Sequence, residues 1–231
     1  MKVTYLGHAC VNIEIKGKYF LVDPFISANP LAKHIDISTI KADYILLTHA
    51  HQDHILDAEA IAKNTGAKLI SNPEILAHYR ALGLDGHEMN IGGSHRFENG
   101  SVKIKMIKAV HSSSFSDGKY GGNPAGFLID SDDLTVYISG DTALHLDMTI
   151  IPHQYKINLA ILPIGNNYTM GVRDALTAAR FVDTYHTLGV HYDTFDVIKI
   201  DHEASVNKFA AAHRKLHLLP IGESLDVENF R

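Results

Sequence analysis

Hydrophobic and polar residues alternate at the start of the chain, and this alternation predicts three β-strands. Apolar side chains recur at every second position within residues 2–6 and 11–15, as expected for strands with one buried face, and residues 19–22 form a short apolar run of strand length. Lys16-Gly17-Lys18 supplies a tight turn before the third strand, and Asp23-Pro24 ends that strand. We therefore expect this part of the chain to form a β-meander.

The remainder of the chain alternates between apolar runs of strand length and amphipathic stretches of helix length. Residues 26–40 have no sustained period and predict a long surface loop or short helical pieces. Two batches of strands with interspersed helices indicate an α/β fold in which two packed sheets are covered by helices. The expected elements are strands at 44–48, 68–71, 102–110, 126–130, 134–139, 159–162 and 188–191, a turn at Asp132-Asp133, and helices at 55–64, 73–82, 173–186 and 203–215.

Length and composition favour one compact domain that spans residues 1–231. The chain is 45% hydrophobic and 20% charged, and it contains no short repeat, low-complexity tract or flexible linker. Its net charge of -5 provides no broad basic field, so general nucleic-acid binding is not expected. A small-molecule substrate is the expected partner, and a homo-oligomer is left open.

Targeting signals and cysteine content indicate a cytoplasmic protein. The N-terminus has no basic stretch followed by an apolar run, and no apolar run has the length that spans a membrane. Cys10 is the only cysteine, so the chain can form neither an intramolecular disulfide nor a cysteine-rich zinc module.

Histidine is the unusual component, with 16 residues dispersed along the chain. His49 and His51 follow a predicted buried strand, where an i, i+2 spacing points both rings toward one ion. Asp53 and His54 fall where the chain turns into a helix, and their side chains can serve a second ion beside the first. A solvated surface cluster is the competing interpretation, but four ligand-type residues at this spacing favour a metal site.

Two metal ions need more ligands than one segment provides, and three further candidates lie at the ends of predicted strands. They are His111, Asp141 and His191, each of which follows an apolar run. Taken singly, each has an ordinary explanation as a turn aspartate or a strand-end histidine. Together with segment 48–54, they predict a metal centre at the ends of the strands.

In their order along the chain, these motifs resemble the metallo-β-lactamase superfamily. The resemblance covers nearly the whole chain and implies a four-layer αβ/βα sandwich with its site at the sheet edges. Within the superfamily, the chain looks like the metal-dependent hydrolases related to ascorbate-6-phosphate lactonase. The motifs that carry this closer likeness are Tyr5-Leu6-Gly7-His8, Val22-Asp23-Pro24-Phe25, Asn29-Pro30, His111-Ser112-Ser113-Ser114, Pro163-Ile164-Gly165 with Thr169-Met170, and His191-Tyr192-Asp193-Thr194-Phe195.

The resemblance also implies a role for each ligand. Asp23 would lie behind the ligands and orient the histidine-bearing loop. At position 166 the family pattern leads us to expect Asp, whereas this chain has Asn166, which removes a charge near the expected substrate mouth. The implied ligand sets are His49, His51 and His111 for one ion, Asp53, His54 and His191 for the other, and Asp141 as a bridge between both.

The chemistry expected from these ligands is hydrolysis by a hydroxide bound to two divalent metal ions. Zinc is the first expectation for the metal, with manganese or iron as alternatives. Asp53 and Asp141 are the expected catalytic residues, and Asp53 would orient the hydroxide. The substrate would be a small ester, lactone or phosphorylated metabolite. A phosphodiesterase or phospholipase D-like hydrolase is the alternative, and a non-hydrolytic di-iron or metal-binding protein is more remote.

Three further residues are candidates for contact with the substrate. His8 lies in the turn after the first strand, where a turn histidine with a structural role is the competing interpretation. Asn166 and Tyr168 belong to a loop after strand 159–162, and ordinary turn composition explains them equally well.

Overall fold

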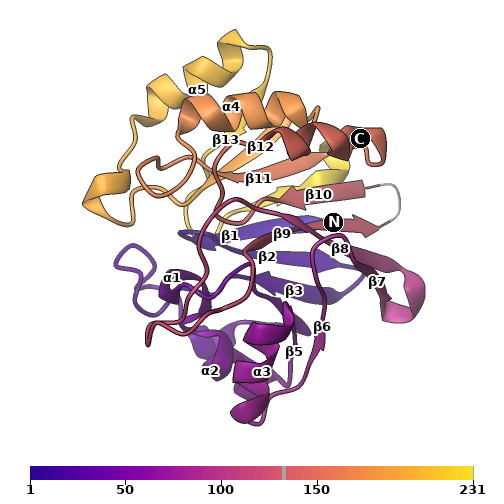
Figure 1. Cartoon of the computed structure of the whole chain (residues 1–231). Helices are drawn as coiled ribbons and strands as arrows, with labels where there is room; N and C mark the ends of the chain where they lie inside the picture. Colours follow the sequence, from indigo (N-terminus) through magenta and orange to yellow (C-terminus); the bar gives the residue numbers. More distant parts are fainter. Residues whose placement is uncertain (132–133, 231) are drawn as a thin grey trace.

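Two seven-stranded sheets form the centre of the molecule (Figure 1). The computed structural model describes residues 1–131 and 134–230, so the turn expected at Asp132-Asp133 lies outside the described residues. In spatial order, the first sheet contains β14 (Ser224–Asp226), β1 (Lys2–Gly7), β2 (Cys10–Ile15), β3 (Lys18–Val22), β4 (Tyr44–Leu46), β5 (Lys68–Ser71) and β6 (Gly86–Glu88). The second contains β13 (Lys215–His217), β12 (His186–Val190), β11 (Leu159–Pro163), β10 (Leu134–Ile138), β9 (Ala125–Ser131), β8 (Val102–Lys108) and β7 (Ser94–Phe97).

Helices cover the outer face of each sheet, which completes four layers. In Figure 1, α4 and α5 lie above the sheets, whereas α2 and α3 lie below them. The structure therefore has the four-layer αβ/βα sandwich that the resemblance implied. The helices are α1 (Gln52–Ile55), α2 (Ala58–Thr65), α3 (Pro73–Ala81), α4 (Val172–Phe181) and α5 (His202–Ala211), and the 3-10 helices are η1 (Ile37–Thr39), η2 (Glu98–Gly100), η3 (Leu146–His153), η4 (Asp196–Ile198) and η5 (Val227–Phe230).

The main core lies between the two sheets and follows from the alternation seen in the sequence. In β2, for example, Val11, Ile13 and Ile15 point into this core, whereas the residues between them face the other way. Phe127 of β9 is fully buried in the same cluster. Because each sheet also packs against helices on its outer face, its central strands are apolar on both faces.

Several predicted boundaries differ from the structure for local reasons. The helix expected at 55–64 is divided into α1 and α2, with Asp57 between them. The helices expected at 173–186 and 203–215 end earlier, at Phe181 and Ala211. Soon after these ends, Asp183 and His213 adopt left-handed backbone conformations that no helix continues through. Strands β6, β7, β13 and β14 were not expected, because they are short and largely polar.

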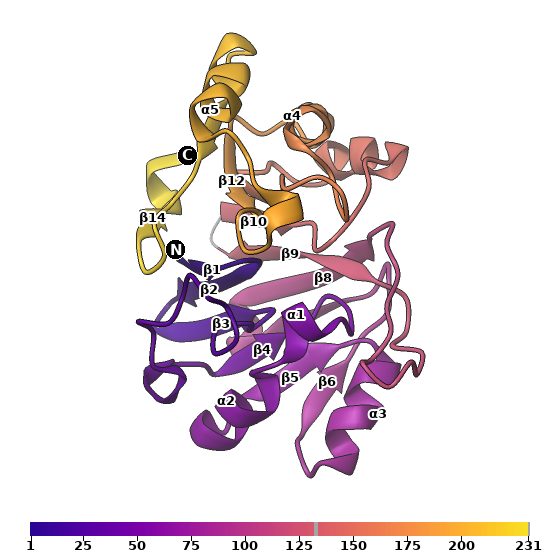
Figure 2. The same cartoon turned by 90° about the vertical axis from the view of Figure 1, so that its left-hand side faces the viewer.

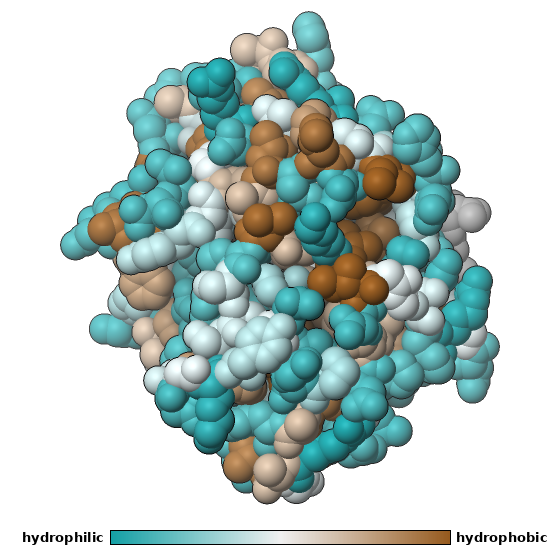
Figure 3. Space-filling view, in the orientation of Figure 1, coloured by the Kyte–Doolittle hydropathy of each residue, from teal (hydrophilic) through white to brown (hydrophobic). Residues whose placement is uncertain are grey.

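Several apolar residues are exposed on the surface of the molecule, including two in η3. Figure 3 shows hydrophobic residues gathered mainly in the centre and upper half of one face of the molecule. Leu146 and Ile150 in η3 are 74% and 57% exposed. No helix among the described residues is long and apolar enough to cross a membrane.

Replacement of Phe127 by alanine tests the core between the sheets. The Phe127→Ala substitution removes a fully buried ring, so we expect the free energy of unfolding to fall by about 3–5 kcal/mol. The matched change Leu146→Ala removes an exposed apolar side chain and should change it by less than about 0.5 kcal/mol. Urea unfolding of both variants measures the difference, and equal effects would contradict this description of the core.

Candidate metal centre

The candidate ligands come from strands whose ends meet at one edge of the two sheets. β3, β4 and β5 are parallel neighbours in one sheet, and β10, β11 and β12 are parallel neighbours in the other. Because the carboxyl ends of parallel strands meet at the same edge, the loops after β4, β10 and β12 gather there. In Figure 2, this side faces the viewer, with the short helix α1 in front of the strands.

One ligand group contains His49, His51 and His111. Their ligand atoms lie within 4.8 Å of one another, and His49 Nε2 is 3.0 Å from His51 Nδ1. His49 is fully buried, whereas the other two rings are partly exposed. The segment after β4 and the loop after β8 therefore bring three imidazoles to one point.

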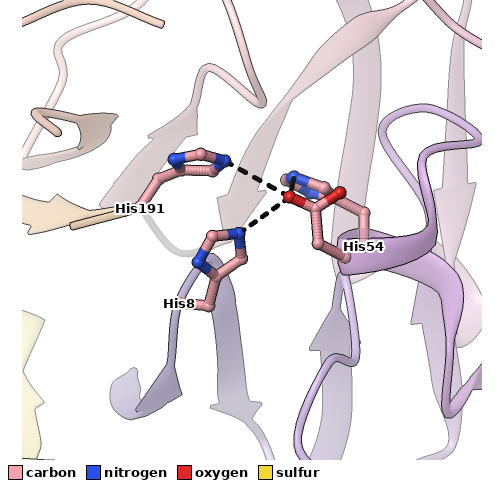
Figure 4. A group of neighbouring side chains, drawn as sticks. His8, His54 and His191 are labelled. Carbon is pink, nitrogen blue, oxygen red and sulfur yellow. Dashed lines mark hydrogen bonds and ion pairs between the residues drawn. The ribbon is translucent and has the colours of Figure 1, made fainter. Parts of the chain in front are cut away.

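A second ligand group contains Asp53, His54 and His191, together with His8. Asp53 Oδ2 lies 3.1 Å from His8 Nε2, 3.6 Å from His191 Nε2 and 3.9 Å from His54 Nε2. Figure 4 shows His8 and His191 reaching this carboxylate from loops beyond the strands, while His54 comes from the helix side. The structure thus adds one histidine to the three residues that the resemblance implied.

Asp141 lies between the two groups. Its Oδ2 atom is 4.0 Å from His49 Nε2, 3.3 Å from His54 Nε2, 3.6 Å from His111 Nε2 and 3.1 Å from His191 Nε2. Its side chain is almost fully buried. One carboxylate oxygen therefore faces imidazoles from both groups, which is the placement expected of a residue shared by two ions.

Asp23 lies behind the ligand segment and is hydrogen-bonded to it. Its Oδ1 accepts a hydrogen bond from Thr48 N at 2.8 Å, and its Oδ2 accepts one from Thr48 Oγ1 at 2.7 Å. His54 Nδ1 lies 2.8 Å from the same Oδ2. Asp23 therefore fixes both the backbone before His49 and the ring of His54.

Two supporting residues were not recognised from the sequence in these roles. His8 is buried behind Asp53, and its Nδ1 lies 3.0 Å from Thr194 Oγ1. Asp57 is also buried and accepts backbone hydrogen bonds from Ile26 at 2.6 Å and from Ser27 at 2.9 Å. No sequence signal distinguishes these residues from a turn histidine and a helix-start aspartate, because their partners are distant in the chain.

Burial and neighbouring charges set the protonation states in the cluster. Burial lowers the pKa of His49, which favours the neutral ring that binds metal. Burial alone would raise the pKa of Asp141, but His191 and His54 hold it well below its usual range. Burial lowers the pKa of His191, but Asp141 and Asp53 together raise it to about 9. In the absence of metal, protons on imidazoles thus balance the carboxylates.

These residues fit divalent cations. His54 Nε2 is buried and has no hydrogen-bond partner among the described residues, although it faces Asp141 and Asp53. A buried polar nitrogen without a hydrogen bond lowers the stability of the protein. A metal ion bound to His54 Nε2 would remove this cost. The mixture of imidazole and carboxylate ligands suits zinc, manganese or iron.

A cavity of about 570 Å³ opens beside the ligands. Tyr168, predicted to contact substrate, forms part of its wall, whereas His8 lies behind Asp53 and Asn166 lines a separate cavity near α4. The walls of the first cavity are formed by His51, Gln52, Asp53, His111, Ser112, Ser114, Phe115, Ser116, Asp141, Tyr168, His191 and Phe195.

Comparison with known proteins places this site in a family. Residues 2–191 match the family described as "Beta-lactamase superfamily domain". The chain belongs to the beta-lactamase superfamily. It is 55% identical over 227 residues to a UPF0173 metal-dependent hydrolase from Flavobacterium johnsoniae, with 98% of this chain and 100% of the relative covered. It is also 40% identical over 232 residues to the UPF0173 metal-dependent hydrolase YtkL from Bacillus subtilis, again with 98% and 100% covered.

A solved structure agrees with this membership of the superfamily. Igni18, described as a novel metallo hydrolase from the archaeon Ignicoccus hospitalis, is 35% identical and superposes with a TM-score of 0.88. The alignment covers 97% of each chain. Together with the relatives, it shows that the chain is a metal-dependent hydrolase of the beta-lactamase superfamily, whereas the closer likeness to ascorbate-6-phosphate lactonase stays a prediction.

Loss of the Asp23 carboxylate should weaken metal binding without removing a ligand. We expect Asp23→Ala to reduce the affinity for zinc roughly 10- to 100-fold, because Thr48 and His54 lose the acceptor that orients them. Competition with a chromogenic chelator measures this affinity. Asp43→Ala is the matched control. Asp43 also accepts hydrogen bonds, from Lys18 Nζ and Tyr19 N, but it is not one of the residues at the metal site. Unchanged zinc affinity in the Asp23 variant would contradict the supporting role.

Proposed function

We propose that this single-domain protein hydrolyses a small ester or lactone, phosphorylated or not, with two divalent metal ions as cofactors. The observation that carries the proposal is the position of Asp141 Oδ2, which faces four imidazole nitrogens within 4.0 Å. Four histidines around one buried carboxylate, with a second carboxylate alongside, form a ligand set large enough for two ions. We infer zinc as the first candidate and manganese or iron as the alternatives.

The proposed ligands divide as the geometry groups them. His49, His51 and His111 would hold one ion, Asp53, His54 and His191 would hold the other, and Asp141 would contact both. When bound, such ions lower the pKa of water and stabilise negative charge on a carbonyl or phosphoryl oxygen.

The chain's own residues then position the reactants. Asp53 lies at the floor of the cavity with its carboxylate held by His8 Nε2 at 3.1 Å. From this position it can orient an attacking water and accept a proton from it. Thr194 in turn holds the opposite side of the His8 ring, so the aspartate cannot turn away from the cavity freely.

A phosphodiester is the second candidate substrate. Its single negative charge lies on the reacting phosphoryl group, where the same two cations would bind it. The cavity would therefore need no other positive group for that reaction.

We further propose a cytoplasmic location, because the one cysteine, Cys10, is free and buried and suits a reducing compartment.

We also propose that the protein can form a homo-oligomer. The exposed apolar side chains of Leu146 and Ile150 in η3 could form part of an interface between subunits.

Removal of a ligand tests the proposed function. We expect His51→Ala to abolish hydrolysis of lactones, aryl esters and phosphodiesters together, because the metal centre serves all three. The assays use protein reconstituted separately with zinc and with manganese. His153→Ala, which changes an exposed histidine outside the site, should retain activity, and circular dichroism verifies that both variants are folded. Full activity of folded, metal-saturated His51→Ala protein would refute the proposal.

A further inference from the structure

Among the residues that the structure describes, 1–131 and 134–230, none of those that line the metal-site cavity is a lysine or an arginine. The lining residues are histidine, aspartate, glutamine, serine, phenylalanine and tyrosine. The proposed metal ions can bind one anionic group at the reacting centre. A second ionised group of the substrate, bound elsewhere in the cavity, would lose its hydration and would find no cationic side chain to pair with. The cavity therefore restricts the charge of its substrate.

Three lysines close in sequence to the cavity loops are paired with acids. Lys108 Nζ lies 2.6 Å from Asp147 Oδ2, Lys119 Nζ lies 2.7 Å from Asp117 Oδ2, and Lys199 Nζ lies 2.7 Å from Asp196 Oδ1. All six side chains are at least half exposed, so each pair contributes little to the net electrostatic field. The chain as a whole carries a net charge of -5. Neither the rim nor the overall charge thus attracts a polyanionic ligand.

The basic residues of this region belong to a different cavity. Arg173, Lys199 and Lys208 line a space of about 490 Å³ beside α4 and α5, together with Asn166. Tyr168 does not line that space but faces the metal site. A phosphate placed next to the metal ligands would therefore meet the tyrosine and serines of its own cavity.

Three aromatic rings form the apolar part of the wall. Tyr168 and Phe195 are 57% and 38% exposed, so part of each ring faces the solvent beside the metal ligands. Phe195 is held by an edge contact with His8 at 5.4 Å, and Phe115 stacks on His78 at 4.4 Å. Held rings of this kind present apolar surface to a ligand at little entropic cost.

We infer that the substrate is an ester or lactone with an apolar or aromatic portion and no ionised group away from the reacting carbonyl. The aromatic rings would pack against the apolar portion, and the hydroxyls of Ser112, Ser114 and Ser116 would bond to neutral polar groups. The inference rests on the proposed function and narrows it. In the reaction, the water oxygen bonds to the acyl carbon, the bond from that carbon to the leaving oxygen breaks, and the leaving oxygen takes up a proton.

Matched substrate pairs test the inference. One pair is 4-(hydroxymethyl)phenyl acetate and its phosphate monoester, and the other is 5-(hydroxymethyl)-γ-butyrolactone and its phosphate monoester. The members of a pair share the reacting carbonyl and differ in one remote phosphate group, which is ionised at neutral pH. With zinc-loaded protein, we expect kcat/KM to favour the neutral member of at least one pair by about tenfold or more.

The outcomes separate this inference from the proposed function. Equal rates within both pairs, or faster hydrolysis of the phosphorylated members, would overturn the inference and leave ester hydrolysis standing. Failure to hydrolyse any of the four compounds, or a phosphodiester, would overturn the proposed function and the inference with it.

Two variants test the cavity wall directly. Ser114→Lys should raise kcat/KM for the phosphorylated members relative to the neutral ones, roughly 2- to 5-fold. The control Ser38→Lys, on the exposed surface of η1, should not.

Tyr168→Ala should raise KM for the neutral aryl acetate roughly 2- to 10-fold with little change in kcat. Tyr185→Ala is its control, because Tyr185 is similarly exposed and lines another cavity. Unchanged charge preference in Ser114→Lys and unchanged KM in Tyr168→Ala would contradict the assignment of the wall.

Discussion

The metal site depends on groups that offset the negative charges of two carboxylates at the edge of the sheets, the buried Asp141 and the partly buried Asp53. An ionised carboxylate in a buried position is costly unless charges or hydrogen bonds offset the loss of water. Here the compensation comes from the imidazoles of His8, His54, His111 and His191, which lie in four separate parts of the chain. Both sheets and their loops must therefore be in register before the site can form, which ties the chemistry to the completed fold.

Much of this arrangement could be predicted from the sequence, because it depends on periodicity and spacing. Apolar alternation indicates the central strands, and ligand-type residues directly after those strands indicate the edge at which they meet. His49, His51, His111 and the other implied ligands are indeed brought together there. The helix and strand ends were less predictable, since left-handed residues such as Asp183 and His213 decide them locally.

The remaining features could not be predicted because they arise from contacts between distant segments. His8 and Thr194 are 186 positions apart, and nothing in either local sequence indicates that the histidine supports Asp53. Likewise, Asn166 and Tyr168 belong to one loop, yet they line two different cavities. The absence of lysine and arginine from the described cavity wall is also a property of the folded chain, since basic residues occur close by in the sequence.

Anomalous X-ray diffraction from zinc-soaked crystals can show directly whether two metal ions bind at the two ligand groups. We expect two peaks per chain. One should lie within bonding distance of His49, His51 and His111, the other within bonding distance of Asp53, His54 and His191, with Asp141 beside both. A single peak, or peaks bound by other residues, would show that these two ligand groups do not hold two ions.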